Sequence, residues 1–290
     1  MSDICLPASV AAARSAFPCG LEQPPGAYRF GADALLLGAW AAHCLGEAGR
    51  VAAVAELGCG CGAALFALLL HPALTRSPSL SLGMDDKEAL CAAARKNAKM
   101  LGLPSCRFVR GDVGDPAFLR QCGQSAFAAV LANPPYDLPG RTAALPLREQ
   151  ALRSASCSDT ETSRKEDGQL ALNVFCRAAS RLLTHHGRFY AIFPAGDISR
   201  LLSALSSARL GLRRLLPVHA DRQHPALRLL VEARRDAASD CRLLPPLFLH
   251  ALERGSGPGW TPEALHFCPW LAGAGQEGAL SKVEAVSREP

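Results

Sequence analysis

An apolar run that stops at two consecutive prolines constrains the fold of this chain more than any other feature. All six residues of Phe127–Ala132 are apolar, which is typical of a buried strand. The next four residues are Asn133, Pro134, Pro135 and Tyr136. Because proline has no N–H to donate to a sheet, the strand must end at Asn133. The pattern therefore predicts an asparagine, a rigid turn and an aromatic ring at one end of a buried strand.

This tetrapeptide suits the binding of a planar amine or amide. The side-chain oxygen of Asn133 and the backbone carbonyl of Pro134 can both accept hydrogen bonds from one NH2 group. Tyr136 can stack on the ring that carries the group. The alternative is a plain turn that ends a strand, because Asn-Pro is common in turns. Residues upstream favour the binding interpretation.

Segments of strand character alternate with segments of helical periodicity along most of the chain. This alternation predicts an α/β fold with a doubly wound, mostly parallel, seven-stranded sheet. We expect strands at 51–57, 79–84, 106–109, 127–132, 188–193, 212–218 and 226–232. Because a short polar link joins the last two strands, they are expected to pair antiparallel at one end. Helices are expected at 32–45, as an N-terminal extension, and at 63–70, 87–101 and 168–183.

Three regions are expected along the chain. Residues 1–27, rich in Ala, Pro and Gly, suggest an irregular lead-in, 28–268 form the α/β domain, and 269–290 form a flexible tail. The polar stretch Ser154–Asp167 interrupts the alternation after the Asn133 turn. We expect it to be a mobile loop on the side of that turn, with a tolerated surface insertion as the alternative.

Composition excludes several classes of protein. A hydrophobic content of 49% over 290 residues excludes general disorder. The 12 cysteines are scattered without a CxxC pair, so we expect free thiols in a reducing compartment and no metal site. No stretch reaches the ~18 apolar residues of a membrane span, and the N-terminus is a poor match to a signal peptide. The cytoplasm is therefore the expected location, and a monomer is the default state. A net charge of +5 permits a nucleic-acid partner without demanding one.

A glycine-rich turn follows the first predicted strand. It reads Glu56-Leu57-Gly58-Cys59-Gly60-Cys61-Gly62. Glycines let the backbone turn sharply and let a ligand approach the main chain. The spacing contains neither GxGxxG nor Gly-Lys-Ser/Thr, which disfavours pyrophosphate cofactors and P-loop nucleotides.

Acidic residues mark the ends of the first three strands. Asp85 can hold a ribose diol with one carboxylate, and Asp112 can accept from an adenine amino group. Glu56 can meet the cationic end of a ligand. Each acid alone is more often a solvated strand-end residue, but together they suit a cationic nucleoside without phosphate. S-adenosylmethionine fits that description.

On these segments the chain resembles the class I S-adenosylmethionine-dependent methyltransferases, which have a Rossmann-like fold. In more detail it resembles the bacterial valine-tRNA adenine-N6 methyltransferases, from about residue 28 to about 267. The specific parts are the segment FGADALLLGAW, which ends at Trp40, and the Asn133–Tyr136 motif. The glycine turn supports only the superfamily. Further matching segments are Gly111-Asp112, 146–150 and 224–231.

The resemblance implies S-adenosylmethionine as cofactor and assigns residues to it. The three glycines of the turn would shape the cofactor site, with Glu56 beside the methionine moiety. Asp85 would hold the ribose and Asp112 would contact the adenine edge. Asp33 would lie near the cofactor at the rim of the site. Departures from the family are Glu56, where Asp is common, and Ala32, where a small polar residue is frequent.

The resemblance also implies an acceptor, which is N6 of adenine in tRNA. Asn133 and Pro134 would bind the target NH2 and Tyr136 would stack on the base. Candidates for holding RNA phosphates, each of them alternatively a solvated surface residue, are Arg141, Arg148, Arg153, Arg213 and Arg214. Three alternatives remain open. They are methylation of a protein glutamine, methylation of guanine N2 in rRNA, for which Phe in place of Tyr136 is more typical, and a non-catalytic RNA-binding scaffold.

Overall fold

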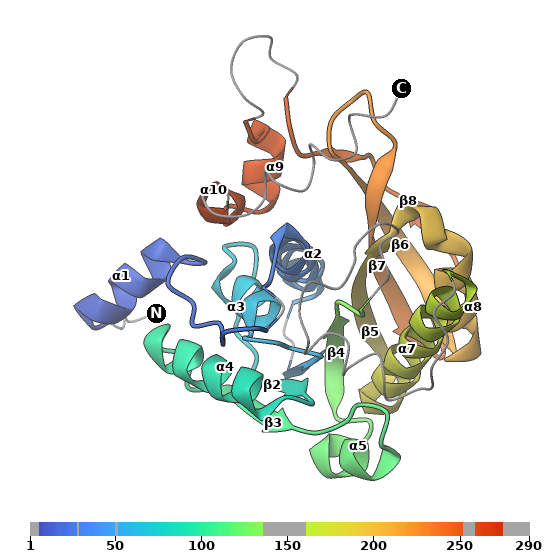
Figure 1. Cartoon of the computed structure of the whole chain (residues 1–290), viewed down its shortest axis with the longest axis horizontal. Coiled ribbons are helices and arrows are strands. Elements are labelled where there is room, and N and C mark those ends of the chain that lie inside the picture. Colours follow the sequence, from blue (N-terminus) through green and yellow to red (C-terminus); the bar gives the residue numbers. More distant parts are fainter. Residues whose placement is uncertain (1–5, 28, 50–51, 136–160, 252–258, 275–290) are drawn as a thin grey trace.

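Nine strands form one sheet in the part of the chain that the computed structural model describes, which is residues 6–27, 29–49, 52–135, 161–251 and 259–274 (Figure 1). Their order is β3-β2-β1-β4-β5-β7-β6-β8, and β9 also pairs with β6. The strands are β1 Ala53–Leu57, β2 Leu80–Asp85, β3 Cys106–Arg110, β4 Phe127–Ala132, β5 Leu183–Pro194, β6 Leu210–His219, β7 Ala226–Arg235, β8 Arg242–Leu243 and β9 Leu247–Phe248.

The sheet is mostly parallel, which confirms the predicted fold class. Strands β3, β2, β1, β4 and β5 run parallel, and β7 runs antiparallel to both β5 and β6. All seven predicted strands are present, and the last two form the expected antiparallel pair. The two-residue strands β8 and β9 are additions to the prediction, and both pair parallel to β6.

Helices cover both faces of the sheet (Figure 1). α2, α3 and α4 share one hydrophobic core with the sheet, while α5, α7 and α8 share the other. This is the doubly wound arrangement. The bounds are α1 Ala8–Ala16, α2 Ala32–Ala48, α3 Ala63–Leu70, α4 Glu88–Met100, α5 Pro116–Gly123, α7 Glu161–Leu182, α8 Ile198–Ser207, α9 Pro262–Phe267 and α10 Leu271–Ala274.

The composition of β4 follows from this layering. Ala129 and Leu131 belong to the core under α2 and α3, whereas Val130 and Ala132 belong to the core under α7. Because side chains alternate between the two faces of a strand, a strand covered on both sides needs apolar residues at every position. The uninterrupted apolar run is therefore what a strand in the middle of the sheet requires. Asn133 follows directly after its last residue, at the carboxyl end of this central strand.

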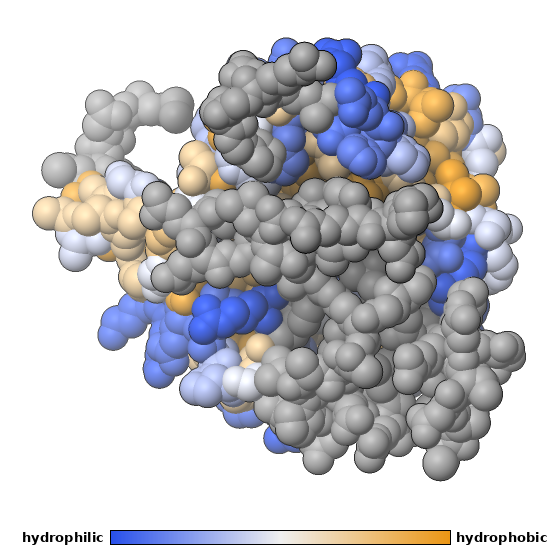
Figure 2. Space-filling view, turned by 45° about the horizontal axis from the view of Figure 1, so that its top comes forward, coloured by the Kyte–Doolittle hydropathy of each residue, from blue (hydrophilic) through white to orange (hydrophobic). Residues whose placement is uncertain are grey.

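The predicted irregular lead-in over residues 1–27 is wrong for Ala8–Ala16, which form α1. Alanine has the highest intrinsic helix propensity, and this segment is rich in it. Arg14 on α1 donates from Nε to the carbonyl of Leu101 at 2.8 Å and from Nη2 to that of Gly102 at 3.1 Å. These carbonyls lie at the end of α4, so α1 caps that helix. α1 contributes no buried residue and projects at the left of Figure 2, where apolar and hydrophilic residues are interspersed on its surface.

The predicted loop Ser154–Asp167 is wrong from Glu161 onward, because the backbone is helical there and begins α7. Glu, Arg and Lys in this stretch are good helix formers, and their polarity misled the loop prediction. Residues 154–160 lie outside the described ranges. In the predicted tail, Leu271–Ala274 form α10, and residues 275–290 are not among those described. None of the described helices is long and apolar enough to span a bilayer.

Candidate active site

The carboxyl ends of β1, β2 and β4 meet at one edge of the sheet. Leu57, the last residue of β1, is paired with the residues that immediately precede Asp85 on β2 and Asn133 after β4. Gly58, Asp85 and Asn133 therefore stand at the same level of three neighbouring strands. The strand order also reverses between β1 and β4, since β2 and β3 lie on one side of β1 and β4 on the other. Open α/β sheets bind ligands at such a switch point.

The glycine turn bends sharply through left-handed backbone at this edge. Gly58, Gly60 and Gly62 have φ of 64°, 54° and 92°. A Cβ at Gly60 would meet no atom within 4 Å, so the main chain is open to a ligand there. A Cβ at Gly62 would lie 2.5 Å from the Phe66 ring, so this glycine is required by packing. A Cβ at Gly58 would lie 3.2 Å from the ring of Phe175, a residue of α7 that sequence reasoning did not single out.

Alanine substitutions should separate these two roles. Gly60→Ala is expected to cost about 1–2 kcal/mol in backbone strain and to weaken S-adenosylmethionine binding through its new methyl group. Gly62→Ala carries the same strain and adds a clash with Phe66, so its melting temperature should fall further. Thermal unfolding with calorimetric titration of the cofactor measures both effects. Equal melting temperatures for the two variants would contradict the packing role of Gly62.

Asp85 ties the glycine turn to the end of β2. Its carboxylate accepts from the N–H of Gly60 at 2.9 Å and from that of Lys87 at 3.0 Å, and the residue is 7% exposed. Burial raises the pKa of Asp85 above its ordinary value, against the lowering effect of these two hydrogen bonds. A carboxylate has about four acceptor positions, so Asp85 keeps capacity for further donors such as a ribose diol.

Glu56 is the second carboxyl group beside the turn. It is 3% exposed, and its Oε2 accepts from the N–H of Leu65 in α3 at 3.1 Å. Burial raises the pKa of Glu56 well above its ordinary value, and the charge of nearby Asp85 raises it further. Two acids in a covered setting favour a positively charged ligand, because a cation offsets the cost of ionising them.

The other predicted cofactor residues lie further out. Asp112 is exposed beyond the end of β3, and its Oδ1 accepts from the N–H of Gly114 at 2.7 Å in a local turn. Asp33 stands in the first turn of α2, and its Oδ2 lies 3.0 Å from Nε of Arg228 on β7. Sequence reasoning did not single out Arg228 as the partner of Asp33, although Arg228 lies in the matching segment 224–231.

Asn133 presents an unused acceptor at this edge. The residue is half-buried, and its Oδ1 is buried with no hydrogen-bond partner among the described residues. A buried acceptor without a donor costs about 1–3 kcal/mol, so such a group usually has a functional explanation. Pro134 is buried beside it. Tyr136 lies outside the described residues.

The predicted RNA-binding arginines do not gather at this edge in the described part of the chain. Arg213 and Arg214 lie near the start of β6, whereas the carboxyl edge is at its other end. Arg141, Arg148 and Arg153 fall outside the described residues. The ten cysteines in the described ranges are free thiols, and no group of three His, Cys, Asp or Glu residues there could hold a metal ion.

Comparison with known proteins identifies the family. No family model matches the sequence. A Porphyromonas gingivalis protein named tRNA1(Val) (adenine(37)-N6)-methyltransferase is 30% identical over 232 residues, covering 76% of this chain and 80% of that protein.

Solved structures support the fold. A predicted O-methyltransferase from Agrobacterium tumefaciens has a TM-score of 0.60 at 20% identity, covering 82% of this chain and 96% of its own. A Listeria monocytogenes protein assigned to the class I S-adenosylmethionine-dependent methyltransferases has a TM-score of 0.54 at 11% identity, covering 82% and 73%.

These comparisons agree with the sheet order, the glycine turn and the paired acids. The fold is that of the Rossmann-like S-adenosylmethionine-dependent methyltransferases, and S-adenosylmethionine is the cofactor. With relatives of this identity and coverage, the chain belongs to the tRNA1(Val) (adenine(37)-N6)-methyltransferase family.

Proposed function

We propose that this methyltransferase acts on N6 of an adenine in tRNA. The observation that carries the proposal is the Oδ1 of Asn133, which has no hydrogen-bond partner among the described residues and stands level with the glycine turn at the switch point. An amino group of a substrate could donate the hydrogen bond that this amide oxygen can accept. The name of the Porphyromonas gingivalis relative supports adenine in tRNA as the bearer of that group.

The residues at the turn fit the proposed placement of S-adenosylmethionine. The open main chain at Gly60 would lie against the cofactor, and Asp85 would hold its ribose. Glu56 would face the cationic methionine end, and Asp112 would contact the adenine edge. Asp33 would stand at the rim. When bound, the cofactor supplies a methyl group that its sulfonium already makes electrophilic.

Asn133 and Pro134 would act on the acceptor nitrogen. The Asn133 side-chain oxygen and the Pro134 carbonyl would each accept a hydrogen bond from one N–H of the amino group. These bonds would favour a more tetrahedral nitrogen, whose lone pair is less delocalised into the ring and faces the methyl group. Because proline fixes φ, the carbonyl is held in place before the substrate arrives. The contribution of these residues is positioning and electrostatic preorganisation.

The target base must leave its stack to reach this edge. Unstacking costs a few kcal/mol in a duplex and less in a loop. Stacking on Tyr136 would return about 1–3 kcal/mol. An unpaired adenine in a tRNA loop is therefore the substrate that this arrangement favours.

Transfer of labelled methyl from S-adenosylmethionine to bulk tRNA, followed by mass spectrometry of nucleosides, tests the proposal. We expect N6-methyladenosine. Label in rRNA as N2-methylguanosine, or in a protein fraction at glutamine, would keep the methyltransferase and overturn the substrate. Cofactor binding without transfer to any acceptor would instead support a scaffold role.

A further inference from the structure

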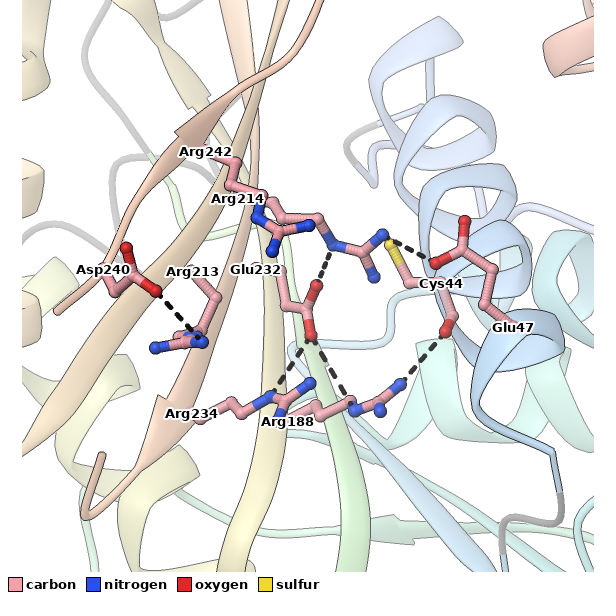
Figure 3. Close-up of a pocket in the computed structure, with 9 residues that line it drawn as sticks. All are labelled: Cys44, Glu47, Arg188, Arg213, Arg214, Glu232, Arg234, Asp240 and Arg242. Atoms are coloured by element: carbon pink, nitrogen blue, oxygen red, sulfur yellow. Dashed lines mark hydrogen bonds and ion pairs between the residues drawn. The ribbon is translucent and has the colours of Figure 1, made fainter. Parts of the chain in front are cut away.

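A cavity lies on the α2 side of the sheet, away from the glycine turn. Its volume is about 280 Å³, and it opens between the end of α2 and strands β5, β7 and β6 (Figure 3). Three acids and five arginines line it, the arginines being Arg188, Arg213, Arg214, Arg234 and Arg242. The register separates it from the active site. Arg188 pairs with Arg234, six positions along β5 from the Pro194 pair at the carboxyl edge, which is roughly 20 Å.

Glu232 forms the floor of this arginine pocket and forms ion pairs with three of its guanidinium groups. It is 1% exposed and forms ion pairs with Nε of Arg214, with Nε of Arg234 at 3.6 Å and with Nε of Arg188 at 3.8 Å (Figure 3). Arg188 also donates to the carbonyl of Cys44 at 3.0 Å. The buried carboxylate therefore hydrogen-bonds Arg214 and attracts Arg188 and Arg234 at longer range. In the described part of the chain, Oε1 of Glu232 and Nε of Arg234 have no hydrogen-bond partner.

Arg214 is the most firmly held of these cations. Its Nη1 lies 2.8 Å from Glu47, and its guanidinium lies 5.4 Å from the centre of the Trp40 ring. Trp40 is itself tied to β7 by a hydrogen bond of 3.1 Å from its Nε1 to the carbonyl of Val231. The inner wall of the pocket is thus rigid, because helix and sheet are joined around it.

Positive charge remains after all ion pairs are counted. Five guanidinium groups face three carboxylates, and two of the acids, Glu47 and Asp240, have side chains that are 66% and 73% exposed. Water screens such exposed charges. Arg242 is exposed, and no ion pair or hydrogen bond of its guanidinium is found within the described ranges. Within the same ranges, the Arg213 guanidinium is held by Asp240 at 3.5 Å and by the carbonyl of Ala238 at 3.4 Å.

We propose that the arginine pocket binds a backbone phosphate of the RNA substrate at a point remote from the target base. Planar guanidinium groups match the oxygens of a phosphate, and a fixed inner wall with two less constrained arginines at the rim suits a passing phosphodiester. The proposal rests on RNA being the substrate. Because the pocket lies roughly 20 Å from the carboxyl edge along the strands, a folded tRNA can reach both places, but an oligonucleotide of a few residues cannot.

A double variant at the rim tests the site. Arg213→Ala with Arg242→Ala leaves the buried Glu232 network in place, so the fold should survive, and thermal unfolding verifies this. We expect the affinity for full-length tRNA to fall at least tenfold. The slope of log K against log salt should decrease in magnitude by about 0.7–0.9, because the variant loses one phosphate contact. Affinity for a short oligonucleotide that carries the target adenine should fall much less.

Matched variants control for charge alone. Arg107 and Arg120 are exposed on β3 and α5, toward the other end of the sheet, so replacing both by Ala removes the same charge without touching the pocket. This control should leave tRNA affinity within about twofold of the unmodified protein. Asp240→Asn removes a rim carboxylate and should instead tighten tRNA binding and steepen the salt dependence.

The outcomes distinguish the pocket from the proposed function. Equal salt slopes for the rim and control variants, or equal losses for long and short RNA, would overturn the phosphate site. The expected binding changes without methyl transfer to RNA would uphold the site and overturn the proposed function. If the unmodified protein binds no tRNA, both fall.

Discussion

Asn133→Ala is expected to lower the rate of methyl transfer by about 10²–10³-fold while the affinity for S-adenosylmethionine stays within about twofold. The variant loses one of two acceptors that would orient the target amine. The proposed cofactor residues, among them Glu56 on β1 and Asp85 on β2, are not changed by this substitution. A single-turnover assay at saturating RNA measures the rate, and calorimetric titration measures cofactor binding.

Stability serves as the internal control for this variant. Because Oδ1 of Asn133 has no partner among the described residues, its removal breaks no hydrogen bond there, and the melting temperature should change little. Asn133→Asp gives a matched comparison, since it keeps the size and an acceptor but brings a negative charge. A parallel loss of transfer rate and cofactor affinity in Asn133→Ala would contradict the acceptor role.

Glu56→Gln is expected to make the protein more stable at neutral pH and to weaken cofactor binding. Burial raises the pKa of Glu56 well above 4.5, its value in an exposed setting. Between those two pKa values the folded state holds a proton that the unfolded state has lost, so stability falls as pH rises. Above the folded pKa the full cost of the buried charge remains. Glutamine keeps an oxygen for the Leu65 N–H at 3.1 Å and carries no charge.

Melting temperatures of both proteins from pH 4 to pH 8 test this prediction. The curves should converge near pH 4, where Glu56 is protonated in both states, and the variant should melt higher as pH rises. Calorimetry at pH 8 should show weaker binding of S-adenosylmethionine, because glutamine offers no charge to a cation. A variant that is less stable than the unmodified protein at pH 8 would sink this account.

Sequence reasoning placed the central elements well because several signals agreed there. In β4 the apolar run, the two prolines and the strand length all point to the same bounds, and the prediction matched Phe127–Ala132. The helix over 63–70 also matched. Because parallel strands share their carboxyl edge, the positions of Asp85 and Asn133 at the ends of predicted strands were enough to predict that both lie at the edge of the glycine turn.

Elements with weaker periodicity were missed or shortened. α5 escaped prediction although Asp115 caps it and Pro116 opens it, because eight residues are too short a stretch to establish a helical period. β5 begins directly after α7 at Leu183, where no glycine or proline marks the change. The strand expected at 188–193 therefore begins five residues earlier, and it includes His186, whose φ is 57°.

The positions of Arg213 and Arg214 in the fold could not be predicted, for a different reason. They were chosen because positive charge near the active site would hold RNA phosphates. Whether these two arginines lie near the carboxyl edge of the sheet depends on where β6 begins and ends. Their ion-pair partners depend on the register between β6 and β7, which sets Arg214 opposite Glu232. Neither follows from the local sequence, because register is set by contacts across the sheet.

The chain separation between paired strands has a consequence for folding. β6 and β7 are joined by a short link and can pair as soon as both are present, whereas Val54 on β1 must find Ala129 on β4. Closing the longer loop costs more entropy, so we expect the hairpin to form early and the β1–β4 pair late.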